Sequence, residues 1–135
     1  MNVSGKPVRI AVRVLSVLLC VFFLMAGVPK LLGVEAHVQH FVTWGYPDWF
    51  RLVVGAVEVC AAILVVVPGM AHIGASAIAV IMAGATYTHV IRVPEEADRA
   101  PFTMALMLLA AIVGYARYRE MTAAQSAGQK TPSTV

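Results

Sequence analysis

The sequence predicts an all-α fold, an integral membrane four-helix bundle whose N- and C-termini are cytoplasmic. Three observations predict it: an apolar composition, four apolar segments of spanning length, and basic residues at both ends of the chain. Of 135 residues, 60% are hydrophobic and 13% are charged, and the mean hydropathy is +0.82. Soluble domains are roughly 45–50% apolar and about 25% charged. A soluble protein of this size could not bury so much apolar surface, so lipid is the expected solvent.

The four apolar segments have the length that crosses a membrane, since about 20 apolar residues span a hydrocarbon core of about 30 Å. They cover approximately residues 10–32, 49–67, 71–91 and 102–118. Together they predict one domain over residues 1–120, and the small polar residues of 121–135 predict a disordered cytoplasmic tail. The basic start of the first segment would also suit a signal peptide. The sequence lacks an A-x-A-like cleavage site, so a retained helix is the favoured interpretation.

The connections between the segments differ in length. Pro68 and Gly69 leave almost no loop between the second and third segments, which predicts a tight helical hairpin. The first connection, residues 33–48, mixes polar and aromatic residues, which is typical of an interfacial stretch or of a short amphipathic helix on the membrane surface. Pro94 and Pro101 bracket the third connection, which is rich in acidic residues.

Lysine and arginine residues predict the orientation. Lys6, Arg9 and Arg13 lie at or before the start of the first segment, and Arg117, Arg119 and Lys130 lie at or after the end of the fourth. An even number of spans places all six on one side, which the positive-inside rule makes cytoplasmic. A composition rich in Ala, Val, Gly and Arg fits a bacterium, so we expect a multi-pass protein of the bacterial cytoplasmic membrane, with the lipid bilayer as its surroundings. No basic patch interleaved with aromatic residues supports nucleic-acid binding.

Small residues recur on one face of the third segment. Ala71, Ala75, Ala79 and Ala83 follow one another at four-residue spacing. Small residues let helix backbones approach closely in lipid. Two interpretations stay open, namely packing inside the bundle and a face for a homo-oligomer.

One carboxylate lies deep inside a predicted span. Glu58 follows Trp49 by nine residues, so it lies ~13 Å from the outer end of its helix, close to the membrane midplane. A carboxylate there must be protonated, paired or hydrated. Its own helix offers no partner. The partner must therefore come from another helix, from water or from a ligand.

Lys30, after the helix-disturbing Pro29, and His89 lie in the outer third of neighbouring segments. One interpretation is an outward-opening polar pocket that takes a proton, a quinone head group or a small polar substrate. Glu58 and His89 are then the candidate proton-handling pair. The candidate ligand-binding residues are Lys30, Thr86, Tyr87 and Arg92. In the other interpretation, Lys30 snorkels to the interface, His89 bonds backbone or water, and Glu58 holds helices together.

No cofactor motif is evident in the sequence, although a quinone would suit such a pocket. His37 and His40 are spaced i, i+3 without carboxylate or thiolate support, so no metal site is predicted. Cys20 and Cys60 form no C-x-x-C pair, and we interpret them as small buried packing residues. Glycine-rich phosphate loops and serine-nucleophile elbows are absent.

Two short motifs occur in order along the chain, A-G-x-x-K-L over residues 26–31 and G-x-x-E over residues 55–58, and a helical hairpin follows them. With F-V-T-W-G-Y-P at residues 41–47 and M-A-G-A-T-Y-T-H at residues 82–89, the chain resembles the DoxX-like family of small bacterial membrane proteins. The resemblance covers nearly everything except the tail. It implies a four-helix membrane bundle with Lys30 and Glu58 as its characteristic polar residues.

The resemblance leaves three functions open. The family takes its name from a subunit of a thiosulfate:quinone oxidoreductase. The first hypothesis is therefore a redox-associated, quinone-linked membrane module or subunit that works with a soluble partner oxidoreductase, and any enzyme role would be that of an oxidoreductase subunit. The second is a non-catalytic membrane chaperone or assembly scaffold for a membrane-protein client. The third is a small-solute carrier, which is less favoured because four spans would have to oligomerise for alternating access.

Overall fold

The computed structural model describes residues 5–130, and this part of the chain contains helices and no strands. With 88% of the residues helical, the all-α prediction is confirmed. The five α-helices are α1 (Lys6–Leu32), α2 (Glu35–Thr43), α3 (Asp48–Leu64), α4 (Ala71–Tyr87) and α5 (Ala100–Gln129). A π-helical turn, η1 (Thr88–Arg92), and a 3-10 helix, η2 (Pro94–Arg99), connect α4 to α5.

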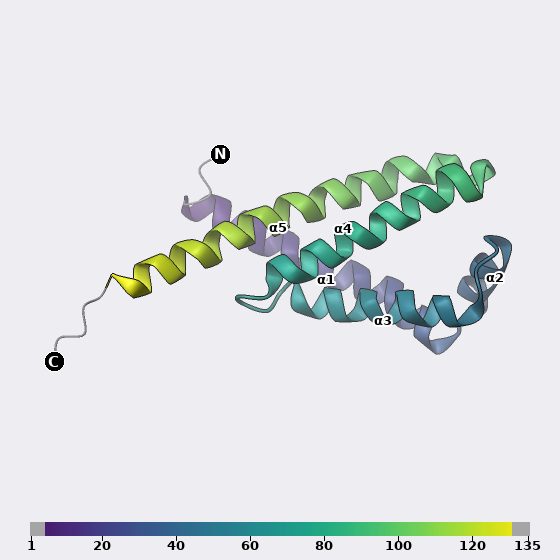
Figure 1. Cartoon of the computed structure of the whole chain (residues 1–135), viewed down its shortest axis with the longest axis horizontal. Helices are drawn as coiled ribbons and strands as arrows, with labels where there is room; N and C mark the ends of the chain where they lie inside the picture. Colours follow the sequence, from purple (N-terminus) through teal and green to yellow (C-terminus); the bar gives the residue numbers. More distant parts are fainter. Residues whose placement is uncertain (1–4, 131–135) are drawn as a thin grey trace.

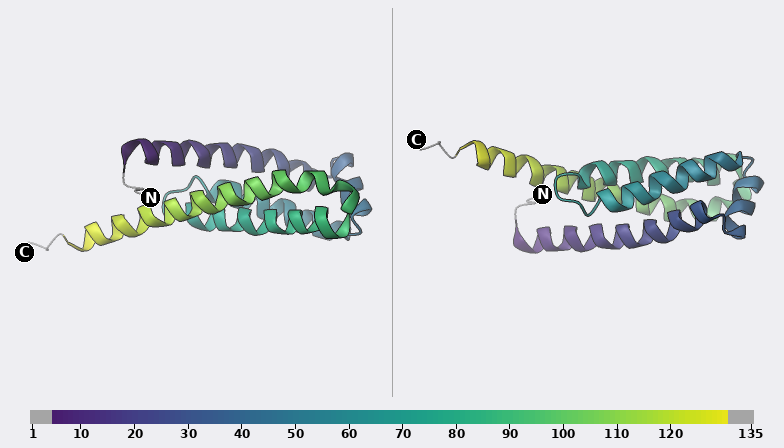
Figure 2. Two further views of the ribbon diagram at one scale, coloured as in Figure 1. Left: turned by 90° about the horizontal axis from the view of Figure 1, so that it is seen from above. Right: turned by 90° about the horizontal axis from the view of Figure 1, so that it is seen from below.

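The four long helices run alongside one another in alternating directions, and the short α2 lies at one end of them (Figure 1). Helix α1 packs along α3, and α4 packs along α5. The tight α3–α4 hairpin joins these two pairs. Two further views show that α1 and α5 stay apart where they reach beyond the hairpin (Figure 2). We call the end with α2, η1 and η2 the outer end, and the opposite end the terminal end, because α1 begins there and α5 finishes there.

Three helical stretches are long and apolar enough to cross a membrane, and they cover Lys6–Leu32, Ala71–Arg92 and Pro94–Gln129. Helix α3 has 17 residues and is not among them. The structure therefore supports three of the four predicted spans on length and composition alone.

The outward faces of the helices are apolar, as lipid-facing surfaces are. Large hydrophobic side chains are exposed on α1 from Ile10 to Leu32 and on α5 from Phe102 to Tyr118. They include Val14, Leu18, Val21 and Met25 on α1, and Phe102, Leu108, Ile112 and Tyr115 on α5. Soluble proteins rarely expose contiguous apolar patches of such extent, so these faces are suited to hydrocarbon.

Small side chains bring α4 and α5 together. Ala71 and Ala75 are buried, and a Cβ on Gly114 would lie 3.2 Å from the Cβ of Ala75. Ala83, by contrast, is exposed. The first half of the alanine face therefore serves packing inside the chain, and a homo-oligomer through the rest of it stays a prediction.

The predicted hairpin is present, because α3 ends at Leu64 and α4 begins at Ala71. Gly69 adopts φ +80°, a left-handed conformation that glycine reaches without a steric penalty. The first turn of α4 also packs closely against α3, since Gly74 lies directly against the end of α3.

Two details differ from the sequence prediction. Helix α5 continues to Gln129, whereas a helix end near residue 118 and a disordered tail from residue 121 were expected. Residues 121–127 are mostly good helix formers with no proline or glycine, so nothing local stops the helix; residues 131–135 lie outside the described part. Cys60 is exposed and Cys20 half-buried, so neither is the fully buried packing residue that was expected.

We predict that Gly74→Ala destabilises the protein by about 1–3 kcal/mol, the usual cost of overpacking. The new Cβ would lie 2.5 Å from the backbone nitrogen of Val65 and 2.7 Å from the carbonyl oxygen of Ala61. Gly84→Ala is the matched control, because nothing lies within 4 Å of its Cβ position and alanine favours a helix by up to about 1 kcal/mol. Thermal unfolding in mild detergent measures both variants. Equal stabilities would contradict the close approach at Gly74.

Candidate functional site

Helices α1 and α3 approach most closely at a pair of glycines. A Cβ on Gly27 would lie 2.9 Å from the carbonyl oxygen of Gly55. A Cβ on Gly55 would lie 3.0 Å from the carbonyl oxygen of Gly27. The approach is reciprocal, and any larger residue at either position would force the two backbones apart.

This crossing brings Lys30 and Glu58 together, since each lies three residues after its glycine. Nζ of Lys30 lies 2.8 Å from Oε2 of Glu58 and also donates to the carbonyl oxygen of Ala26 at 3.1 Å. The two side chains are 13% and 4% exposed, so the ion pair is buried. Lys30 is thus the partner from another helix that a carboxylate at the depth of Glu58 requires.

Arg51 adds a second buried charge to the same side of α3. Its Nε and Nη2 lie 2.9 and 2.8 Å from Oδ1 of Asp48, and its Nη1 donates to the carbonyl oxygen of Lys30. That carbonyl belongs to the last turn of α1, where its backbone partner is the Gly33 amide at 3.4 Å. The sequence analysis did not single out Arg51. The available signal was its spacing, seven residues or two helical turns before Glu58, which puts both on one face.

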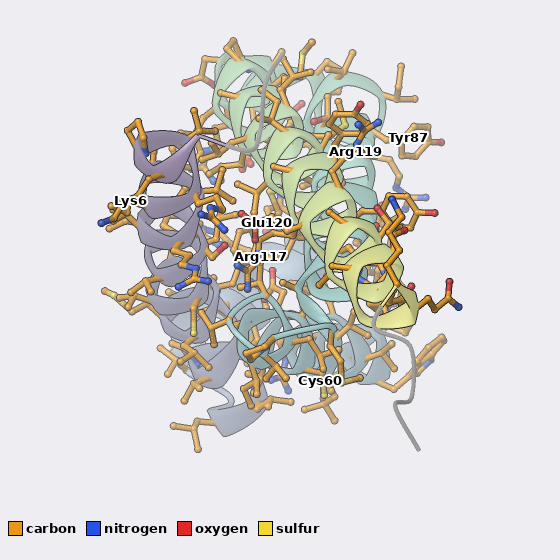
Figure 3. All side chains as sticks on the ribbon, turned by 90° about the vertical axis from the view of Figure 1, so that its left-hand side faces the viewer. Lys6, Cys60, Tyr87, Arg117, Arg119 and Glu120 are labelled. Carbon is orange, nitrogen blue, oxygen red and sulfur yellow. The ribbon has the colours of Figure 1, made fainter. Side chains whose placement is uncertain are left out.

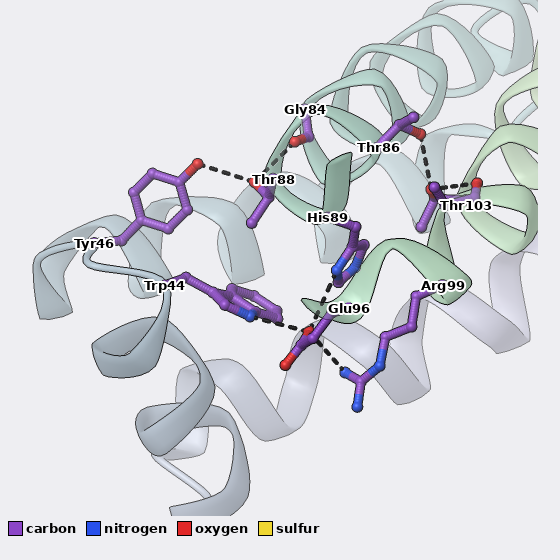
Figure 4. A network of polar contacts seen from close by, with 10 residues as sticks. Trp44, Tyr46, Gly84, Thr86, Thr88, His89, Glu96, Arg99 and Thr103 are labelled. Carbon is purple, nitrogen blue, oxygen red and sulfur yellow. Dashed lines mark hydrogen bonds and ion pairs between the residues drawn. The ribbon is translucent and has the colours of Figure 1, made fainter. Parts of the chain in front are cut away.

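A separate cluster of four side chains closes the outer end (Figure 4), and we call it the outer cluster. Its members are Trp44, His89, Glu96 and Arg99. Oε2 of Glu96 accepts a hydrogen bond from Nε1 of Trp44 at 3.2 Å, and Nη1 of Arg99 lies 3.3 Å from it. Nδ1 of His89 lies 3.4 Å from the same oxygen. The imidazole is buried, packs edge-on against the Trp44 ring at 5.5 Å, and has no hydrogen bond of regular geometry at Nδ1.

The π-helical turn η1 sets the direction of His89. The backbone amide of Val93 bonds the carbonyl oxygen of Thr88 at 2.9 Å, five residues back. The Thr88 hydroxyl bonds the carbonyl oxygen of Gly84 and the hydroxyl of Tyr46, both at 2.9 Å. These contacts hold the widened turn in place from inside the helix and from the α2–α3 connection.

The other candidate residues of this region have different surroundings. The Thr86 and Thr103 hydroxyls lie 2.7 Å apart and join α4 to α5. Nη2 of Arg92 donates to the carbonyl oxygen of Trp44 at 3.1 Å, and the guanidinium lies 4.7 Å from the centre of the Tyr46 ring. Tyr87 is exposed.

The structure therefore brings Lys30 and Glu58 together and gives His89 a different set of partners. Within residues 5–130, no hydrogen bond or ion pair joins His89 to Lys30 or to Glu58. In the same range, no group of three or more His, Cys, Asp or Glu residues is placed to hold a metal ion. On α2, partial burial lowers the pKa of His37, and the positive charge of Lys30 lowers it further. The neutral form of His37 is thus favoured.

Comparison with known proteins identifies one family. Residues 14–113 match the sequence model of the DoxX-like family. The uncharacterized protein YdgD of Bacillus subtilis (strain 168) is 32% identical over 104 residues, which cover 73% of this chain and 90% of that protein. No solved structure matches the chain.

We predict that the Lys30–Glu58 pair contributes to stability chiefly by mutual neutralisation. Lys30→Met or Glu58→Gln alone leaves a buried group without its partner, and we expect a loss of about 3–5 kcal/mol for the worse of the two. The double variant should recover more than half of that loss. Unfolding of the three variants in mild detergent completes a double-mutant cycle.

Glu35→Gln is the control for this cycle, because Glu35 is exposed and bonds only Gln39 nearby. Its stability should stay within about 0.5 kcal/mol of the parent protein. Additive losses in the double variant would show that Lys30 and Glu58 act independently.

Proposed function

The chain belongs to the DoxX-like family of membrane proteins, and from this premise we propose that it is a quinone-linked membrane module that serves a partner oxidoreductase. The proposal has two parts, a topology of four spans and a proton-handling site at the outer end. Each part is supported by contacts of the described residues.

Helix α3 is the fourth span in this proposal. Its 17 residues extend about 26 Å, close to the thickness of the hydrocarbon core. Its outward side chains are apolar, namely Leu52, Val53, Val57 and Ile63, whereas Arg51 and Glu58 are buried. Four spans place the start of α1 and the end of α5 on one side, in agreement with their common position in Figure 2. The positive-inside rule then makes the terminal end cytoplasmic in a bacterial membrane.

The observation that carries the redox role is the pairing of His89 with Glu96. Trp44 and Arg99 hold the Glu96 carboxylate in place, and His89 Nδ1 lies 3.4 Å from it with no regular hydrogen bond. A fixed carboxylate beside an imidazole can pass a proton at neutral pH. Oxidation of a quinol releases protons together with electrons, so a quinol at the outer end needs such an acceptor.

Lys30 and Glu58 have a structural role in this proposal. Each neutralises the other inside the bundle, so the proton passes between His89 and Glu96 while the ion pair holds α1 against α3. In this proposal a quinone head group approaches the outer cluster from the lipid, at the π-helical turn that carries His89. Such turns often occur at functional sites.

A second candidate function is a non-catalytic scaffold for a membrane-protein client. It is favoured by the same ion pair, because a chain that satisfies its buried charges internally needs no substrate to do so. The exposed apolar faces of α1 and α5 would then receive the client.

A quinone titration that is monitored by tryptophan fluorescence distinguishes the two functions. The chain has two tryptophans, so Trp49→Phe leaves only Trp44, whose ring lies beside His89. Decylubiquinone should quench this fluorescence at a saturable site. Adding His89→Gln should weaken binding about tenfold, the effect of one lost hydrogen bond of ~1.4 kcal/mol.

Trp44→Phe is the matched control, since Trp49 is exposed and reports only quinone dissolved in lipid. When the parent protein is purified from native membranes, a soluble oxidoreductase should be purified with it. The redox proposal is wrong if decylubiquinone quenches both single-tryptophan proteins equally and without saturation. If a membrane-protein client is purified with the chain as well, the scaffold function takes its place.

A further inference from the structure

A cavity of about 670 Å³ opens at the terminal end of the bundle, far from the outer cluster. Its walls are the first turns of α1, the α3–α4 turn and the last part of α5. Seen from this end, Arg117 and Glu120 lie in the middle, between α1 and α5 (Figure 3). The cavity exists because α1 and α5 diverge beyond the short α3–α4 hairpin (Figure 2).

Positive charge dominates this cavity. Its charged and titratable lining residues are Arg9, Arg13, His72, Arg117, Arg119 and Glu120. Four arginines and one glutamate therefore line it. Arg9 and Arg13 are one helical turn apart, so α1 presents both to the same space.

Arg117 is the residue that an ordinary membrane-orientation signal does not explain. Its side chain is only 10% exposed, and its Nη1 pairs with Oε2 of Glu120 at 3.1 Å. Its Nε is buried and has no hydrogen-bond partner. A buried donor without a partner is costly, and arginines that only mark the cytoplasmic side stay in water. Because Arg117 also lines the cavity, an anion bound there would supply negative charge to a guanidinium that is paired on one side only.

We infer that this cavity binds a phosphate group, held by Arg117 and by Arg9 and Arg13 from the facing helix. A guanidinium edge presents two parallel N–H donors that match two oxygens of a phosphate. The surplus of positive charge in the cavity matches the charge of the anion. Basic pockets between helices on the cytoplasmic side of a membrane are suited to phospholipid headgroups, and a soluble phosphate offers the same chemistry.

The site does not depend on the redox proposal, because it lies at the opposite end of the bundle and shares no residue with the outer cluster. The direction of the Arg117 side chain in the site also follows from the fold. Glu120 fixes one side of Arg117 from one turn away on α5, so the guanidinium keeps its direction when the cavity is empty.

The test uses the full chain in micelles of dodecyl maltoside, a detergent without phosphate, with phosphatidylglycerol or inorganic phosphate as the added probe. Binding is measured as a rise in the temperature of thermal unfolding and, for lipid, by retention in native mass spectrometry. A rise with phosphatidylglycerol alone identifies a lipid headgroup, and a rise with phosphate identifies a soluble anion. No rise with either probe overturns the inference.

Arg117→Gln should weaken binding of the effective probe about tenfold or more, because a charge-assisted bidentate contact is lost. Lys130→Gln is the matched control. It removes one positive charge from the same end, and Lys130 does not line the cavity. Its affinity should stay within about twofold of the parent protein. Equal weakening in both variants would show general charge attraction and overturn the site.

Arg13→Gln keeps the test valid if Arg117→Gln fails to give helical, monodisperse protein. Arg13 lies on the opposite wall, on α1, and it is exposed. Its loss should weaken binding by roughly fivefold or more. Unchanged affinity in this variant would remove α1 from the site and contradict the inference.

Discussion

The close crossing of α1 and α3 is the constraint on which the rest of the structure depends. Two glycines remove the side chains that would separate the backbones, and the next turn of each helix then supplies one member of a buried ion pair. Neither charge would be tolerated alone at this depth. The register of α1 against α3 is thus fixed by packing and by charge together. The α3–α4 hairpin then positions α4, and α5 packs along α4.

The two ends of the bundle are built on different principles. At the outer end, α2, η1 and η2 form a cover in which hydroxyl, indole, imidazole and carboxylate groups are joined to one another. At the terminal end no such cover is present among the described residues, and α1 and α5 separate around a basic cavity. The two ends suit the two proposed sites. The side-chain contacts of the outer end fix the proposed proton-handling pair, and the open cavity of the terminal end admits an anion.

Much of the fold could be predicted from the sequence because lipid makes strong demands on composition and length. The hairpin at Pro68 and the short helix before α3 follow from local residues. The end of α5 could not be placed, because alanine-rich polar sequence suits a helix as well as a tail. The sequence predicted that Glu58 needs a partner from outside its helix. The geometry of its pairing with Lys30 depends on Gly27 and Gly55, whose contact joins distant parts of the chain. The contact of His89 with Glu96 depends on a turn type that no local pattern announces.

That turn has a consequence for how such chains can vary in length. A π-helical turn is an α-helix with one residue inserted, and each residue of an α-helix accounts for a rotation of about 100°. Losing one residue between Thr88 and Arg92 would restore a regular helix and swing everything after it around the axis. The imidazole would then leave its carboxylate without any change in side-chain chemistry. A one-residue gap at this point in an aligned relative would therefore mark a different outer end, even where every polar residue is retained.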